Sequence, residues 1–82
     1  MKLRYFASVR ECIGKSEEAL EFGNEVKTVA DLIEKLKTLG DEYKQAFEFS
    51  SLRIAVDQNH VKLDALITGA YEIAFFPPMT GG

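Results

Sequence analysis

The residues with the clearest chemical potential are the last six of the chain, Pro77-Pro78-Met79-Thr80-Gly81-Gly82. None of them has a charged side chain, and the two final glycines have no side chain at all. A glycine terminus can enter a channel that is too narrow for a Cβ atom. The reactive group at the tip is the α-carboxylate of Gly82. The tail is therefore typical of a terminus that a partner protein threads and modifies.

A carboxylate is a poor acyl donor at neutral pH, so the α-carboxylate of Gly82 would need activation. An acyl-adenylate would supply a good leaving group, and a sulfur, amine or thiol nucleophile could then attack the carboxyl carbon. Such a chain would be a group carrier, and a partner enzyme would perform the catalysis. We expect the carrier itself to bind no cofactor and no metal, because one Cys and one His are too few for a structural zinc site.

The composition describes a small globular domain and argues against several functions. The chain has 82 residues, a formal charge of −3 and 46% hydrophobic residues, which suits one domain. A mildly acidic chain without a basic cluster is a poor nucleic-acid binder, and no apolar run approaches the roughly 20 residues of a membrane span. The charged N-terminus is unlike a signal peptide. A single cysteine favours a reducing compartment, so we expect a cytoplasmic protein.

Alternating apolar residues predict the strands that must hold the tail. The predicted strands span residues 2–7, 17–22, 52–57, 61–63 and 71–76. A loop is expected over residues 11–15, with its turn at Gly14, and a polar turn over residues 57–60.

One amphipathic helix is predicted over residues 28–40. Thr28 is a good N-cap and Asp31 suits the first turn, while Gly40 stands where a left-handed C-cap is expected. The apolar stripe of this helix comprises Val29, Leu32, Ile33, Leu36 and Leu39. A short second helix is expected over residues 41–47.

This order of elements predicts an α+β roll of the β-grasp, or ubiquitin-like, kind. A mixed sheet of four to five strands would pack on the one main helix, with the first and last strands side by side. We expect residues 1–76 to form the domain and residues 77–82 to form a flexible tail. The helix should cover the sheet face that bears Leu3, Tyr5, Ile54, Val56, Ile73 and Phe75.

The opposite face of the sheet carries a candidate partner surface. In the predicted register Phe6, Ala55, Ala74 and Phe76 point away from the helix. Exposed apolar clusters often mark partner surfaces, and Phe6 and Phe76 are the candidate anchors. Arg10, beside the exit of the first strand, is either part of the polar rim of this surface or a solvated loop charge.

Several other polar residues receive structural interpretations. Cys12 is interpreted as a small packing residue in a loop, and His60 lies in a polar turn without a second metal ligand nearby. Glu17, Glu18 and Glu21 are interpreted as a solvated strand or loop face.

The C-terminal octapeptide Phe75-Phe76-Pro77-Pro78-Met79-Thr80-Gly81-Gly82 resembles the signature of the MoaD family, within the ubiquitin-like/ThiS superfamily. That family comprises the small, sulfur-carrying subunits of molybdopterin synthase. The stretch from Tyr5 to Glu11, followed by Gly14, is similar to the first strand and loop of the family. The chain departs from the family at Gly69-Ala70-Tyr71-Glu72, where Gly-Asp-Glu is frequent, and at Met79, where Val is commoner.

The resemblance implies a route for sulfur. An adenylyltransferase of the MoeB type would use ATP to adenylate Gly82, and a thiocarboxylate built with persulfide sulfur would follow. The charged tail would then insert into the large synthase subunit, of the MoaE type, and deliver sulfur to cyclic pyranopterin monophosphate. The residues that thread the partner active sites would be Gly81, Thr80, Met79, Pro78 and Pro77. The large subunit would supply the catalytic groups, so this chain alone is not expected to be an enzyme, and the family implies a heterotetramer.

Three alternatives share the same tail. The chain could carry sulfur for another pathway, such as thiazole synthesis or tRNA thiolation, with the same chemistry at Gly82 and a different acceptor. It could be a ubiquitin-like modifier, in which case Gly82 would form an isopeptide bond with a target lysine. It could also be an interaction module whose tail is incidental, and deletion of Gly82 would then leave its function intact.

Overall fold

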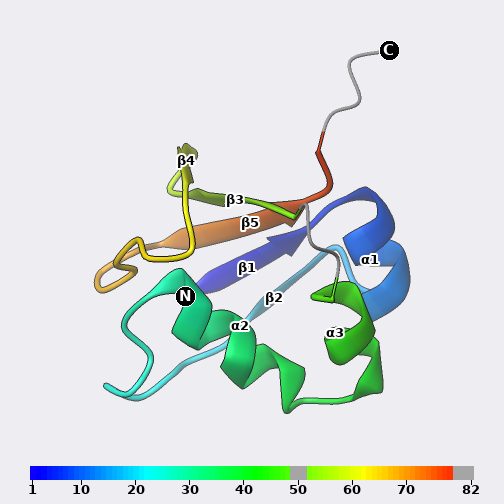
Figure 1. The fold of residues 1–82 in the computed structure, drawn as a ribbon, viewed down its shortest axis with the longest axis horizontal. Helices are drawn as coiled ribbons and strands as arrows, with labels where there is room; N and C mark the ends of the chain where they lie inside the picture. Colours follow the sequence, from blue (N-terminus) through cyan, green and yellow to red (C-terminus); the bar gives the residue numbers. More distant parts are fainter. Residues whose placement is uncertain (49–51, 79–82) are drawn as a thin grey trace.

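A mixed sheet of five strands forms the frame of the molecule, with helices packed on one of its faces (Figure 1). The structure is a computed structural model that describes residues 1–48 and 52–78. The strands are β1 (Lys2–Tyr5), β2 (Glu17–Ala19), β3 (Arg53–Val56), β4 (Asn59–Val61) and β5 (Glu72–Phe76). The helices are α1 (Ala7–Ile13), α2 (Val29–Lys37) and α3 (Asp41–Ala46). The described residues therefore adopt the predicted α+β, β-grasp arrangement.

The first and last strands lie side by side, as predicted. The order across the sheet is β2-β1-β5-β3-β4, with β1 parallel to β5 and the other neighbours antiparallel. The register places Leu3 beside Ile73 and Tyr5 beside Phe75. All four of these side chains are buried, on the face that the helices cover. The chain leaves β5 at the same end of the sheet where it leaves β1 (Figure 1).

The core forms between the sheet and the helices, from apolar side chains that share one face. Of the six sheet residues predicted there, five are buried, and Val56 is half-buried at the end of β3, beside a hairpin turn. The fully buried side chains that fill the centre are Tyr5, Phe75, Leu3, Leu32, Leu36, Ile67, Ile73, Val9 and Val29. Burial of this kind is the main favourable term in the folding of a small domain.

The main helix, α2, is shorter than predicted. The Thr28 side chain accepts a hydrogen bond from the Asp31 N–H, and the Asp31 carboxylate accepts one from the Thr28 N–H, which makes a capping box. The C-cap is Thr38, so the prediction of a left-handed cap at Gly40 is wrong. Gly40 has an extended backbone and precedes the short helix α3, whose existence is confirmed. Leu39, predicted in the buried stripe, lies beyond α2 and is 46% exposed.

A helix that the sequence analysis missed follows β1. The predicted strand over residues 2–7 ends at Tyr5, and the predicted loop over residues 11–15 is largely α1. Val9 and Ile13, four residues apart, are both buried and hold α1 against the core. Gly14 adopts a left-handed conformation with φ 85° and caps the helix, so its role as a turn glycine is confirmed.

The two outer strands are shorter or shifted relative to the predictions. β2 covers only Glu17–Ala19 of the predicted residues 17–22. β4 begins two residues earlier than predicted, because the turn before it contains only Asp57 and Gln58. Both turn residues have positive φ angles, 48° and 71°, which match the right-handed twist of a two-residue hairpin. His60, predicted in a turn, therefore lies in a strand at the edge of the sheet.

Candidate functional site

The two predicted anchors, Phe6 and Phe76, meet at the end of the sheet where β1 and β5 finish. Phe6 follows β1 and is the N-cap of α1, while Phe76 is the last residue of β5. Their ring centroids lie 6.5 Å apart in an edge-to-face arrangement, and the Phe6 N–H donates to the Phe75 carbonyl. Phe6 remains 37% exposed. The structure therefore joins both aromatic residues in one surface, on the face opposite the helices.

An arginine that was not among the predicted site residues completes this surface. The Arg4 guanidinium lies 5.2 Å from the centre of the Phe6 ring, at the range of a cation–π contact. The same guanidinium donates to the Glu72 carboxylate at 3.2 Å. The sequence signal was present, because Arg4 alternates with Leu3 and Tyr5 and must share a face with Phe6. Which ring it would contact was not visible without the register of β1.

His60 extends the aromatic surface across the sheet, and its position accounts for the incorrect prediction that Ala55 is exposed. Its ring centroid lies 5.5 Å from that of Phe76. Ala55, which pairs with both His60 and Ala74 across the sheet, lies between the strands that carry these rings. Ala55 is consequently buried, although it was predicted in the exposed cluster, and Ala74 is half-buried. We call Phe6, Phe76, Ala74 and His60 the aromatic patch.

The remaining predicted site residues lie at or beyond the end of this patch. Arg10 is exposed on α1, one turn after Phe6, and its N–H approaches the Phe6 carbonyl. Pro77 and Pro78 follow β5 directly and are half-buried. The predictions for Met79, Thr80, Gly81 and Gly82 concern positions that lie outside the described residues. The described part of the site is thus the root of the tail and the surface around it.

A polar cluster lies on the helix-covered side of the same strand end. The Tyr5 and Tyr43 hydroxyls both donate to the Glu18 carboxylate at 2.7 Å, and Lys15 donates to it at 3.1 Å. The interpretation of Glu18 as solvated is therefore wrong, since its side chain is only 13% exposed. The Tyr5 ring in turn stacks on Phe75 with a centroid distance of 6.1 Å. Glu18 thereby links β1, β2 and α3 behind the aromatic patch.

The ionisation of this cluster follows from its burial and hydrogen bonds. Burial tends to raise the pKa of Glu18, but the hydrogen bonds from Tyr43, Tyr5 and Lys15 together outweigh it and lower the pKa. Burial, reinforced by the hydrogen bond to Glu18, raises the pKa of Tyr5 and of Tyr43. At neutral pH the cluster therefore holds one carboxylate and two neutral phenols, a stable donor and acceptor set.

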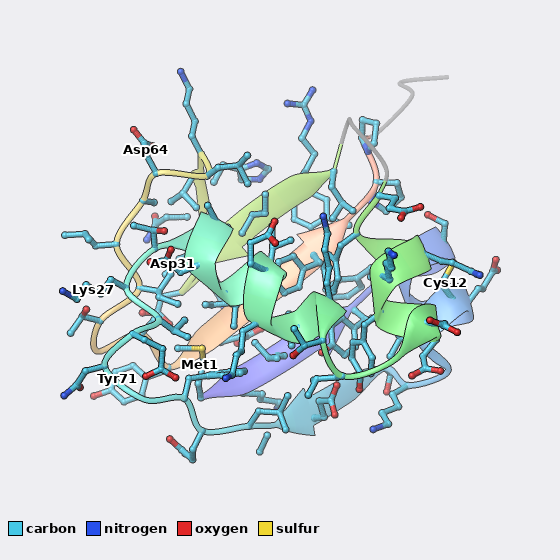
Figure 2. All side chains as sticks on the ribbon, turned by 60° about the horizontal axis from the view of Figure 1, so that its bottom comes forward. Met1, Cys12, Lys27, Asp31, Asp64 and Tyr71 are labelled. Carbon is cyan, nitrogen blue, oxygen red and sulfur yellow. The ribbon has the colours of Figure 1, made fainter. Side chains whose placement is uncertain are left out.

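Other chemically interesting side chains lie apart from the patch. Figure 2 shows Cys12 on α1, at the opposite end of the molecule from Met1 and Tyr71. Cys12 is half-buried and packs against the core, in a helix instead of the predicted loop. In residues 1–48 and 52–78 there is no group of three or more His, Cys, Asp or Glu side chains arranged for a metal ion. No helix in these two ranges is long and apolar enough to cross a bilayer.

The chain is similar along its whole length to known carriers and modifiers. A molybdopterin synthase sulfur carrier subunit from Escherichia coli is 38% identical over 82 residues, covering 100% of this chain and 99% of that protein. A solved structure from Pyrococcus furiosus, described as molybdopterin converting factor subunit 1, superposes with a TM-score of 0.76 at 28% identity over 95% of both chains. The small archaeal modifier protein 1 from Methanosarcina acetivorans gives a TM-score of 0.68 at 26% identity, covering 99% of this chain and 94% of that one. The ThiS family model matches residues 3–82, and the chain belongs to the ThiS family.

Proposed function

We propose that this chain is the sulfur carrier of molybdenum cofactor biosynthesis, the small subunit of a molybdopterin synthase. The observation that carries the proposal is the full-length similarity to sulfur carrier subunits, joined to a C-terminal Gly81-Gly82. The chain itself supplies a reactive terminus and a docking surface, and no catalytic group of its own is invoked. A cytoplasmic location, predicted from the single cysteine, is part of this proposal.

The first half of the proposed cycle loads the tail. An adenylyltransferase of the MoeB type binds the aromatic patch, and a Gly82 carboxylate oxygen attacks the α-phosphate of ATP, which releases pyrophosphate. A persulfide sulfur on a donor cysteine then attacks the carboxyl carbon and displaces AMP. A thiol reduces the resulting acyl disulfide, which leaves a thiocarboxylate on Gly82. No cofactor stays bound to the carrier in this scheme.

The second half of the cycle delivers the sulfur. The loaded chain docks on the large subunit, of the MoaE type, and residues 77–81 thread the tail into the active site of that subunit. Each transfer to cyclic pyranopterin monophosphate consumes one thiocarboxylate and, with water, returns the carboxylate of Gly82. Two transfers build one dithiolene, which suits a heterotetramer with two carriers. The same patch must serve both partners in turn, so docking must be specific and reversible, with an apolar centre and a polar rim.

The geometry around the patch supports this use of the surface. Phe6 and Phe76 provide an aromatic centre on the helix-free face, and aromatic residues are enriched at the centres of binding interfaces. Arg4 and Arg10 supply charge at its border. Because Pro77 follows Phe76 directly, a partner that covers the patch also receives the root of the tail.

The test is the mass of the C-terminal peptide after incubation with the activating enzyme, ATP and a persulfide donor. Replacement of oxygen by sulfur adds nearly the same mass as oxidation of Met79. We therefore use a Met79→Val variant beside the natural chain, and a chain that lacks Gly82 as the control. Sulfur on Gly82 in both full-length chains is the expected result. A terminus that stays a plain carboxylate in both would refute the carrier chemistry.

The modifier function remains the second candidate, because a structurally similar archaeal protein at 26% identity is named a modifier. In that case Gly82 would become linked to the amino group of a target lysine. Peptide mapping from cells that express the chain would find a lysine carrying the C-terminal residues. Conjugates that disappear with Gly82 deleted would establish this second function, with or without the first.

A further inference from the structure

Three basic side chains gather at the outer end of the sheet, beside the aromatic patch. Arg53 begins β3, His60 lies in the middle of β4, and Lys62 directly follows β4. All three are exposed, and together they line one hollow of about 400 Å³ whose other walls include Leu52 and Leu63. We call Arg53, His60 and Lys62 the basic strip.

The basic strip sets like charges against each other. Ile54 pairs with Val61 and Ala55 with His60, so one further step of this register sets Arg53 across from Lys62. Like charges directly opposite each other on two strands destabilise a sheet. No carboxylate is among the described residues that line this hollow. The arrangement therefore costs folding stability, although the chain as a whole carries a net charge of −3.

Half of the ten Lys and Arg side chains are paired with a carboxylate within the described residues, and the two in the basic strip are not. Lys2, Arg4, Lys15, Lys35 and Lys37 each lie within 4 Å of a carboxylate. Among residues 1–48 and 52–78, neither Arg53 nor Lys62 has such a partner. Arg10, Lys27 and Lys44 also have no such partner among these residues, but only Arg53 and Lys62 lie across from each other on neighbouring strands. This like pair, with no described carboxylate beside it, points to an anionic ligand outside this chain.

The backbone beside the strip favours an extended ligand. β4 is the last strand on its side of the sheet, so half of its N–H and C=O groups have no neighbouring strand, and an added strand can bind there. A second hollow of about 390 Å³ between α2 and β3 shares Leu52 and Leu63 with the first. A segment along β4 could place carboxylates on the basic strip and apolar side chains in these hollows.

We propose that the basic strip binds an acidic, extended segment of the large synthase subunit, which pairs with β4 beside the aromatic patch. This inference rests on the proposed function, which supplies that partner. The contact of His60 with Phe76 makes the strip continuous with the aromatic patch, so one partner can cover both. A second copy of this chain is a poor occupant, since it would bring its own cations against the strip.

Charge reversal gives a test in which folding and docking respond in opposite directions. The single variants Arg53→Glu and Lys62→Glu each turn the like pair into an opposite pair, so we expect Tm to rise. The association rate with the large subunit is expected to fall in both variants. In the double variant that combines Arg53→Glu with Lys62→Glu, it should fall by about tenfold at low ionic strength. The matched control is the double variant Lys27→Glu and Lys44→Glu, at two exposed lysines that lie just before α2 and on α3. Stopped-flow measurements at low and high salt separate these effects, because salt screens steering.

Carbodiimide cross-linking then identifies the contact. This reagent joins a lysine amine to a carboxylate that already touches it. Peptide mapping of the complex is expected to link Lys62 to an Asp or Glu of the large subunit. Cross-links confined to lysines on the helix side would overturn the inference.

The outcomes distinguish this inference from the proposed function. One outcome is that the natural chain binds the large subunit, that Phe76→Ala weakens this binding, and that the strip variants bind like the control. In that case the strip has no docking role, and the proposed function stands. If the natural chain does not bind the large subunit, both fail. Sedimentation could also show a concentration-dependent dimer that is lost in the Arg53→Glu, Lys62→Glu double variant. This result would assign the strip to self-association and would overturn the inference.

Discussion

Replacement of Glu18 by Ala should destabilise this domain far more than replacement of its neighbour Glu17. Glu18 accepts hydrogen bonds from the hydroxyls of Tyr5 and Tyr43, and these tyrosines are 1% and 6% exposed. The variant would leave both hydroxyls, which lie in part-buried positions, without their acceptor. Glu17 has an exposed side chain and makes one exposed ion pair, with Lys2.

The magnitude follows from the cost of buried, unpaired polar groups. Each hydroxyl that loses its partner costs about 1–3 kcal/mol, so two of them cost about 2–6 kcal/mol. The variant also removes the desolvation of the carboxylate itself, which opposes this loss. We therefore expect a net decrease of about 3 kcal/mol in the free energy of unfolding. Glu18→Gln keeps one amide oxygen as acceptor and should cost about 1–2 kcal/mol, whereas Glu17→Ala should cost less than about 1 kcal/mol.

Urea unfolding at neutral pH, followed by circular dichroism, measures these differences through the midpoint at constant slope. The pH profile supplies an independent check. The pKa of Glu18 is lower in the folded state than its ordinary value of 4.5, so its contribution is complete above that value. The contribution is lost as the pH falls from about 4.5 through the lower folded pKa. The Glu18→Gln variant should lose less stability over this acid range than the natural chain.

Two results would contradict the reasoning. Equal unfolding midpoints for Glu18→Ala and Glu17→Ala would mean that water replaces the carboxylate at no cost. Suppose instead that the Tyr5→Phe, Tyr43→Phe double variant is as unstable as Glu18→Ala, and that combining all three substitutions lowers the stability no further. This result would support a single shared cluster. Simple additivity of the three substitutions would instead show that these side chains act independently.

Two further predictions concern the capping box and the tyrosines. Thr28→Ala removes half of the capping box of α2 and should lower the free energy of unfolding by about 1 kcal/mol; Thr68→Ala, at an exposed threonine in the loop before β5, is the control in the same urea experiment. In a Tyr71→Phe variant, absorbance at 295 nm should show Tyr5 and Tyr43 ionising above the ordinary value of 10.0. Because their folded pKa values are raised, stability should fall as the pH rises above about 10; ionisation of both at the ordinary value in the folded protein would contradict the cluster.

Several features of this protein follow from the sequence alone because their causes are local. The capping box of α2 needs only Thr28 and Asp31 three residues apart, and the turn at Gly14 needs only a residue that tolerates positive φ. Alternation of apolar residues was enough to assign Leu3, Tyr5, Ile73 and Phe75 to one buried face. The chemistry proposed for Gly82 also rests only on residue types at the terminus, and it stays a prediction.

Other features depend on contacts between distant segments, which no local pattern contains. α1 has no side-chain cap and only two buried residues. Its stability therefore depends on the packing of Val9 and Ile13 into the core. Glu18 looks like an ordinary surface residue until β2 pairs with β1 and α3 brings Tyr43 to it. Arg53 faces Lys62 only once the hairpin turn has set the register. The sequence alone thus determined the residue types that the chain presents at its terminus. Tertiary structure decided which surface forms at the root of the tail, because the contacts of Phe6 and His60 with Phe76 join segments that are far apart in the sequence.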